Sequence, residues 1–168
     1  AALVERLNYD ESSSLHGQIH QHTNPIGKIR DTAIQRIIMS SLSDGILREL
    51  FRKEGGFEQC FQLLSDYFAA VQKVFENDWV DHNPTTSRLV HGCGLVAMGY
   101  VMEYLHATTG AKTVTQFSSG LTPLKENTAW TSGHWNFGVD NKRKWNSLQN
   151  LPRDYKELSY HLLRVLKN

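Results

Sequence analysis

Apolar residues recur at helical spacing in several separate segments of this chain, and this pattern predicts a mainly α-helical fold. The strongest segment covers residues 57–77, where large apolar side chains follow one another every three or four positions: Phe57, Phe61, Leu64, Phe68, Val71 and Phe75. The same spacing occurs before and after it, at 34–42 and at 158–166. We therefore expect an irregular bundle of about five to seven helices joined by long loops.

Residues suited to helix starts mark where three of these helices begin. Thr32 can cap the first, with Gln35 three positions later as its capping-box partner. Ser87 can cap another helix, which we expect to continue to about Leu105. Pro152 suits the first turn of the last helix, because proline lacks the amide proton that would be unpaired there.

Two further segments are expected to be helical and short. The Ser-Asp-Gly sequence at 43–45 should break the helix that begins at Thr32, and a second helix should follow from about 46 to 53. A weak helix is expected at 112–119. Residues 1–8 resemble the end of a helix that begins without a cap, so we expect the chain to be the C-terminal part of a longer protein.

Two long segments carry turn residues instead of a helical pattern. Residues 9–28 are polar and contain Gly17 and Pro25, so they are expected to form a loop with a short extended piece at Leu15–His20. Residues 127–150 are polar, aromatic and irregular, and they contain three of the four tryptophans: Trp130, Trp135 and Trp145. Long loops of this kind are often functional.

The helix expected after Ser87 contains three glycines, at positions 92, 94 and 99. Each glycine costs about 1 kcal/mol relative to alanine in an exposed helix. Gly92 and Gly99 are seven residues apart and share a helix face. We interpret this face as a place where another helix or backbone packs closely.

Composition indicates an ordinary globular protein and excludes some partners. A length of 168 residues fits a single domain, residues 1–168, and 40% of the residues are hydrophobic against 21% charged. The net charge of +1 argues against bulk coating of a polyanion but allows a local basic patch. No apolar run approaches the roughly 18 residues that span a bilayer, so no membrane association is expected.

The only two cysteines, Cys60 and Cys93, lie inside apolar helical segments. Buried free thiols are the favoured interpretation, which is consistent with a reducing cytoplasm. His91 lies two residues before Cys93, but residues two apart on a helix point in different directions, so a reactive thiolate pair is not favoured. The Gly-Cys-Gly sequence at 92–94 lies within a helix, and therefore does not form the phosphate-binding turn that follows a strand.

Three histidines, His16, His20 and His22, form a cluster in the first loop. Imidazoles can share a metal ion when a fold brings them together. No nearby carboxylate or cysteine completes a ligand set here, so surface or hydrogen-bonding histidines are favoured over a metal site. The chain also has no P-loop, no G-x-S-x-G and no dinucleotide-binding glycine pattern, and no cofactor is expected.

Basic residues cluster in three places: Lys28 and Arg30 before the Thr32 helix, Arg48, Arg52 and Lys53 on the short second helix, and Lys142–Lys144. The last two groups could contact nucleic acid. The helix–turn–helix unit at 32–53 places Arg48 and Arg52 on one face of its second helix, where they can meet phosphates. The alternative is a solvated helix face. The third group, Lys142, Arg143 and Lys144, adjoins Trp145, which could stack on a base, unless the tryptophans of this loop plug the helical core instead.

A resemblance to a known family emerges from several short motifs in order. The sequence SRLVHGCGLVAMG at 87–99 resembles the SRL-hHG-Ghh-hG segment (h, hydrophobic) of DGQHR-domain proteins, a family that includes the DndB-like proteins. Further similar segments lie along the chain: Tyr67–Val71 with Phe75 and Trp79, Trp130–Trp135, Lys144–Asn150, Leu7–Asn8 and the helix at Thr32. The resemblance covers nearly all of the chain.

This resemblance implies a DNA-related role and a missing partner domain. Family members carry an N-terminal ParB-like or sulfiredoxin-like portion with the Asp-Gly-Gln-His-Arg signature, and this chain contains no such string. The family is associated with DNA modification and phage defence, and its DndB-like members act as DNA-binding regulators. The chain is thus expected to be the helical C-terminal region, which would bind DNA, support the absent domain or mediate assembly.

Three functions follow as hypotheses. The leading one is a DNA-binding or scaffolding module whose phosphate contacts come from Arg48, Arg52, Arg88 and Lys142–Lys144. The second is an enzyme component, in which His91, Arg88 and the Trp130–Trp135 loop complete a pocket with the absent N-terminal domain and His91 titrates near neutral pH as an acid or base. The third is a homo-oligomerisation module that uses the glycine-bearing helix.

Overall fold

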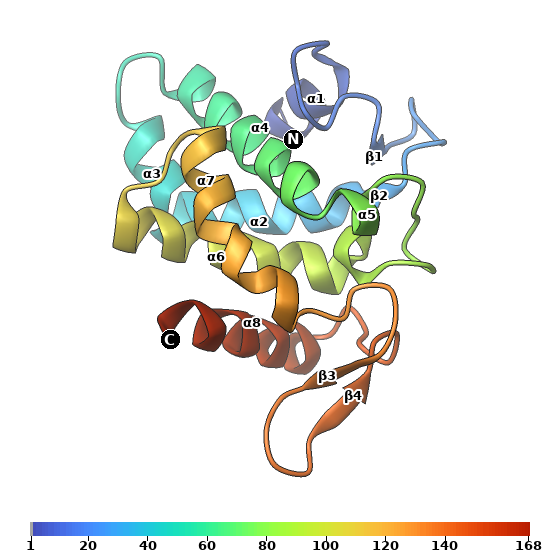
Figure 1. Ribbon diagram of the computed structural model, residues 1–168. Coiled ribbons are helices and arrows are strands. Elements are labelled where there is room, and N and C mark those ends of the chain that lie inside the picture. Colours follow the sequence, from blue (N-terminus) through green and yellow to red (C-terminus); the bar gives the residue numbers. More distant parts are fainter. Residues whose placement is uncertain (1) are drawn as a thin grey trace.

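Eight α-helices carry most of residues 2–168, the part of the chain that the computed structural model describes (Figure 1). This confirms the mainly α-helical prediction. The helices are α1 Ala2–Tyr9, α2 Asp31–Asp44, α3 Ile46–Phe51, α4 Gly56–Val74, α5 Glu76–Trp79, α6 Gly92–Thr109, α7 Val114–Leu121 and α8 Pro152–Lys167. Two 3₁₀ helices and four short strands connect them: η1 Arg88–Val90, η2 Thr122–Asn127, β1 Ile19–His20, β2 Ile29–Arg30, β3 His134–Asn136 and β4 Lys142–Lys144.

The segment expected as one helix at 57–77 is divided after Val74. Phe75 has φ −113° and ψ 42°, which are not helical values, and the single turn α5 follows it. The side chain of Phe75 is buried against Trp130, with ring centroids 6.1 Å apart. Packing of this phenylalanine therefore accompanies the helix break, a long-range contact that helical spacing does not reveal.

Two predicted caps are wrong in detail. The helix expected to start at Thr32 begins at Asp31, and its N-cap is Arg30, which makes no side-chain capping bond. Arg30 is extended because it belongs to β2, so α2 follows directly from the strand. Ser87 caps η1, with its hydroxyl accepting a hydrogen bond from the amide of Leu89, and the α-helix proper starts only at Gly92.

Helix α6 forms the centre of the molecule and packs against α2 on one side and α8 on the other (Figure 1). The predicted close packing of another helix is seen at Gly99, whereas the close neighbour of Gly92 is a loop side chain. A Cβ atom at Gly99 would lie 2.9 Å from the side chain of Ile37 in α2, and one at Gly92 would lie 2.7 Å from the side chain of Asn150. The glycine-bearing face is therefore occupied by residues of the same chain.

The first loop is held together by the buried side chain of Asn8. Its Nδ2 donates to the carbonyl of Ile19 at 2.8 Å, and its Oδ1 accepts from the amide of Ile19 at 3.1 Å. Strand β1 pairs in parallel with β2, with Ile19 opposite Ile29. The extended piece expected at Leu15–His20 is thus limited to Ile19–His20.

The aromatic loop at 127–150 contains an antiparallel hairpin, β3–β4, whose tryptophans support the core. Trp130 and Trp135 are buried and meet edge to face, with ring centroids 4.9 Å apart. His161 of α8 lies against Trp135 in a second edge contact at 5.7 Å. Of the three tryptophans in this loop, two plug the helical core, as the alternative interpretation stated, and Trp145 remains half-buried.

Both cysteines are buried free thiols, in agreement with the favoured interpretation. Within residues 2–168, no helix is long and apolar enough to cross a membrane.

Candidate nucleic-acid interface

The β3–β4 hairpin sorts its basic residues onto two faces. In the register, His134 lies opposite Lys144, Trp135 opposite Arg143, and Asn136 opposite Lys142. Directly opposed residues of an antiparallel pair share a face, and successive residues alternate between faces. Lys142 and Lys144 therefore lie on the exposed face, whereas Arg143 lies on the face that carries buried Trp135.

Arg143 is engaged in holding the hairpin against the start of α8. Its Nη1 lies 3.2 Å from Oδ1 of buried Asp154, its Nε donates to the hydroxyl of Ser147, and its Nη2 donates to the carbonyl of Ser147. Burial alone would raise the pKa of Asp154, but the hydrogen bond from the amide of Gln149 and the nearby Arg143 hold that pKa below its usual value. The predicted DNA contact by Arg143 is thus replaced by a structural ion pair.

Arg88 is also turned inward. Its guanidinium donates to three backbone carbonyls, those of Leu148 at 2.9 Å, Pro84 at 2.7 Å and Asn146 at 2.7 Å. The residue is buried, and burial lowers its pKa. Because its donors are used within the chain, Arg88 has a structural role and is not placed to contact DNA as the sequence predicted.

Trp145, the aromatic residue expected to stack on a base, lies beside this buried arginine. The guanidinium carbon of Arg88 is 5.7 Å from the centroid of the Trp145 ring, within the range of a cation–π contact. The side chain is half-buried. One face of Trp145 is thus engaged within the chain, directly after the end of β4.

Helix α8 adds a row of basic residues that the sequence analysis did not identify. Its exposed side chains include Arg153, Lys156, Arg164 and Lys167. They recur at intervals that place them along one side of the helix, and about 21 Å separates the first from the last at 1.5 Å per residue. Tyr160, with 66% of its surface exposed, lies in the middle of the row.

The acidic residues of the same segment point elsewhere. Asp154 is buried against Arg143, and Glu157 accepts a hydrogen bond from the side chain of Asn141 in the hairpin at 3.1 Å. Both carboxylates therefore connect α8 to the hairpin. From residue 142 to the end of the chain, every exposed charged residue is basic: Lys142, Lys144, Arg153, Lys156, Arg164 and Lys167.

We call these six residues the basic face. Figure 1 shows α8 and the hairpin on the same side of the molecule, with α4 on the opposite side. The net charge counted over separate segments of the sequence is the signal that could have revealed the basic face. Residues 142–168 hold seven Lys and Arg against two Asp and Glu, whereas residues 1–141 hold eleven against fifteen. The overall charge of +1 conceals this difference.

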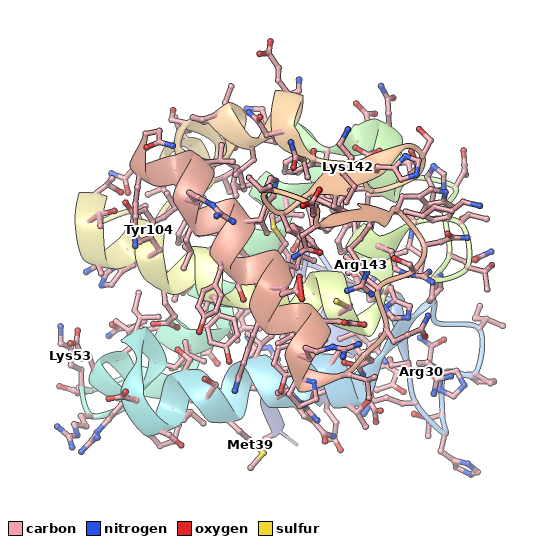
Figure 2. All side chains as sticks on the ribbon, turned by 90° about the horizontal axis from the view of Figure 1, so that it is seen from below. Arg30, Met39, Lys53, Tyr104, Lys142 and Arg143 are labelled. Atoms are coloured by element: carbon pink, nitrogen blue, oxygen red, sulfur yellow. The ribbon has the colours of Figure 1, made fainter. Side chains whose placement is uncertain are left out.

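The other predicted basic group lies far from this face. Arg48, Arg52 and Lys53 are exposed in and just after α3. Figure 2 places Lys53 at the opposite end of the molecule from Lys142 and Arg143. In addition, α3 has only six residues, Arg48 donates to the carbonyl of Ser43 at 3.0 Å, and the expected helix extent to residue 53 is too long by two residues. The structure does not join the two groups into one surface.

His91 occupies the N-cap of α6 and is unsuited to the acid–base role proposed for it. Its Nδ1 accepts a hydrogen bond from the amide of Cys93 at 3.1 Å. Burial, together with the positive charges of Arg88 and Arg30, lowers its pKa to about 4. The expectation that His91 titrates near neutral pH is therefore wrong, because a cationic imidazole is disfavoured at this position.

Cys93 is equally unsuited to nucleophilic chemistry. Burial and the nearby carboxylate of Asp154 raise its pKa to about 12, so the thiol stays protonated at neutral pH. Among residues 2–168, no group of three or more His, Cys, Asp or Glu side chains is placed to hold a metal ion. The cluster of His16, His20 and His22 does not form a ligand set in this fold.

Comparison with known protein families, with curated proteins and with solved structures finds no match for this chain. The candidate interface therefore rests on the positions and charges of its own residues.

Proposed function

We propose that this chain is a DNA-binding or scaffolding module of a DGQHR-type DNA-modification or phage-defence protein, and that the basic face contacts DNA. The observation that carries the proposal is the uniform charge of the exposed side chains from residue 142 onward, all of which are basic. The motifs at 87–99 and 130–135 are the sequence support for the family.

The chemistry of the basic face suits phosphate contacts better than base readout. Lysine and arginine side chains on a convex helix and a hairpin can neutralise backbone phosphates and release counterions, which produces affinity without sequence specificity. The Arg143–Asp154 and Asn141–Glu157 contacts attach the hairpin to the start of α8, which limits movement of one element relative to the other. Limited movement lowers the entropic cost of binding.

A salt titration tests the DNA-binding part. We expect the affinity for a mixed-sequence duplex, measured by fluorescence anisotropy, to fall steeply as salt increases, with a log–log slope of about −0.9 for each phosphate contacted. The double variant Lys156→Glu/Arg164→Glu should weaken binding at least tenfold and flatten this slope.

A matched double charge reversal elsewhere provides the control. Lys73 in α4 and Lys112 after α6 are exposed and lie outside the basic face. Lys73→Glu/Lys112→Glu changes the net charge by the same amount, so it should leave most of the affinity intact. Equal losses in the two double variants would show that only bulk charge matters and would contradict the proposed face.

The same titration compares the two predicted surfaces. Arg52→Glu/Lys53→Glu removes the basic group at the α3 end, which Figure 2 places away from the hairpin. We expect a smaller loss than for the α8 variant. The family assignment has a separate test, since a DGQHR string encoded upstream of Ala1 would support it and a reading frame without one would oppose it.

A further inference from the structure

A second positively charged feature lies outside the basic face, in an open hollow beside the β1–β2 pair. It is lined by His20, Gly27, Lys28, Arg30, Asn83, Pro84 and Thr85. These residues come from two parts of the chain that are more than 50 positions apart in sequence, the first loop with β2 and the turn before η1. Two cations line the hollow, and no carboxylate does.

Lys28 is a half-buried cation that forms no ion pair with any carboxylate between residues 2 and 168. Its Nζ donates to the carbonyl of Trp79 at 2.7 Å and lies 5.6 Å from the centroid of the Trp79 ring. Burial lowers its pKa, and the negative charge of Asp81 opposes that effect, yet Asp81 forms no ion pair with it. An ammonium group has three donors, and a single carbonyl uses one of them.

Arg30 is the second cation, and it is available to a ligand. It is exposed at the end of β2, and no acidic residue among 2–168 pairs with it. Figure 2 shows Arg30 on the side of the molecule away from Lys53. Its positive charge contributes to the lowered pKa of His91, as expected for a cation that is not neutralised nearby.

The turn on the other side of the hollow adds an oriented amide. Oδ1 of Asn83 accepts hydrogen bonds from the amide of Thr85 at 2.8 Å and from the Thr85 hydroxyl at 2.5 Å. This fixes the Asn83 side chain with its oxygen turned toward the turn, and no residue between 2 and 168 accepts a hydrogen bond from its Nδ2. The hollow is therefore lined by two cations and by an asparagine whose Nδ2 has no acceptor among residues 2–168.

We propose that this hollow binds a phosphate group, with Arg30 and Lys28 as the charged donors and Asn83 as a neutral one. A guanidinium fork matches two phosphate oxygens, and an ammonium acts as a point charge beside it. The phosphate can be inorganic, part of a nucleotide, or part of a nucleic-acid backbone, because the same chemistry recognises all three. The proposal does not depend on the DNA-binding role of the basic face.

Nuclear magnetic resonance titration of the chain with defined probes tests this inference. Inorganic phosphate, adenosine monophosphate and a short duplex are added separately, with sodium chloride at equal ionic strength as the reference. We expect the amide signals of Arg30, Asn83 and Thr85 to shift with a phosphate probe and not with chloride. Arg30→Gln should weaken binding about tenfold, because it removes a charge-assisted contact but leaves the backbone of β2 intact.

Two further variants make the result specific. Arg52→Gln removes an exposed arginine at the far end and should leave the phosphate affinity unchanged, and Lys156→Glu/Arg164→Glu should also leave it unchanged while weakening duplex binding. Shifts with inorganic phosphate or the nucleotide identify a free ligand, and shifts with the duplex alone identify a backbone phosphate. No shift at these residues with any of the three probes, or equal weakening by Arg30→Gln and Arg52→Gln, would overturn the proposal.

Discussion

Arg143 in β4 and Asp154 at the start of α8 form an ion pair, with 3.2 Å between Nη1 and Oδ1, and the carboxylate is almost completely buried. This pair turns the middle residue of the Lys-Arg-Lys run inward and leaves Lys142 and Lys144 exposed. The same carboxylate oxygen lies 3.8 Å from Nε of exposed Arg153. The Arg143–Asp154 pair thus connects the hairpin to the start of α8.

Breaking this pair should destabilise the chain. We expect Asp154→Ala to lower the free energy of unfolding by about 2–4 kcal/mol, because a buried partner is lost and both Arg143 and the amide of Gln149 lose an acceptor. Urea denaturation followed by circular dichroism measures the change.

Arg153 provides the control for that prediction, because it also lies near Asp154, at 3.8 Å, but 80% of its side chain is exposed. Arg153→Ala should change stability by less than about 0.5 kcal/mol. If both substitutions proved equally mild, the structural role of the Arg143–Asp154 pair would be refuted.

Substitution of Arg88 should separate stability from DNA binding. Arg88→Lys keeps the charge but cannot donate to three carbonyls in fixed directions, so we expect a loss of about 2–4 kcal/mol in the free energy of unfolding. At a temperature where the variant is folded, its duplex affinity should match that of the parent chain. A weakened affinity in a fully folded variant would return Arg88 to the DNA-contacting set.

The N-cap histidine should make stability depend on pH in a defined window. The pKa of His91 is about 4 in the folded chain, below the roughly 6.5 of an unfolded histidine, so only the unfolded state takes up its proton between these values. Its contribution is therefore complete above about pH 6.5 and is lost as pH falls toward 4. Allowing for partial exposure, we expect a decline of about 1–2 kcal/mol.

The variant His91→Asn isolates this effect. Asparagine can cap the helix but does not titrate. The unfolding free energy of the variant minus that of the parent chain should therefore increase as pH is lowered from 6.5 to 4. Chemical denaturation at several pH values measures it. A difference that stays constant over this range would contradict the lowered pKa.

Replacing either of two glycines of α6 by alanine should lower stability, although helix propensity alone would predict an increase. In an exposed helix, alanine is about 1 kcal/mol more favourable than glycine. At Gly94, however, a Cβ atom would collide with the backbone carbonyl of Arg88, and we expect a loss of about 2–4 kcal/mol. At Gly99 the neighbour is the side chain of Ile37, which can move, so the loss measured by thermal unfolding should be smaller.

Several local features were predictable because they depend on nearby residues. The periodic apolar positions of α4 placed its start within one residue, and Pro152 correctly marked the first turn of α8. The glycines at 92 and 99 correctly indicated close packing. Helix start and packing face in these cases follow from the backbone of one segment and its own side chains.

Whether a charged side chain points to solvent or into the protein was not predictable from nearby residues. The run Lys142–Lys144 reads as three equivalent cations, but strand alternation and the buried Asp154 make the middle one structural. Arg88 reads as a free cation, yet three carbonyls from residues 84, 146 and 148 surround it. These partners are brought together only by the packing of distant segments.

The sequence by itself determined the helical class of this protein, the main helix positions and the excess of basic residues near its end, since these depend on composition and local periodicity. Tertiary structure alone decided which cations face solvent. Burial of α8 against α6 and the hairpin turns Asp154 and Glu157 inward and leaves Lys156 and Arg164 outside. The physical reason is that a buried carboxylate requires a partner, whereas an exposed cation is already satisfied by water.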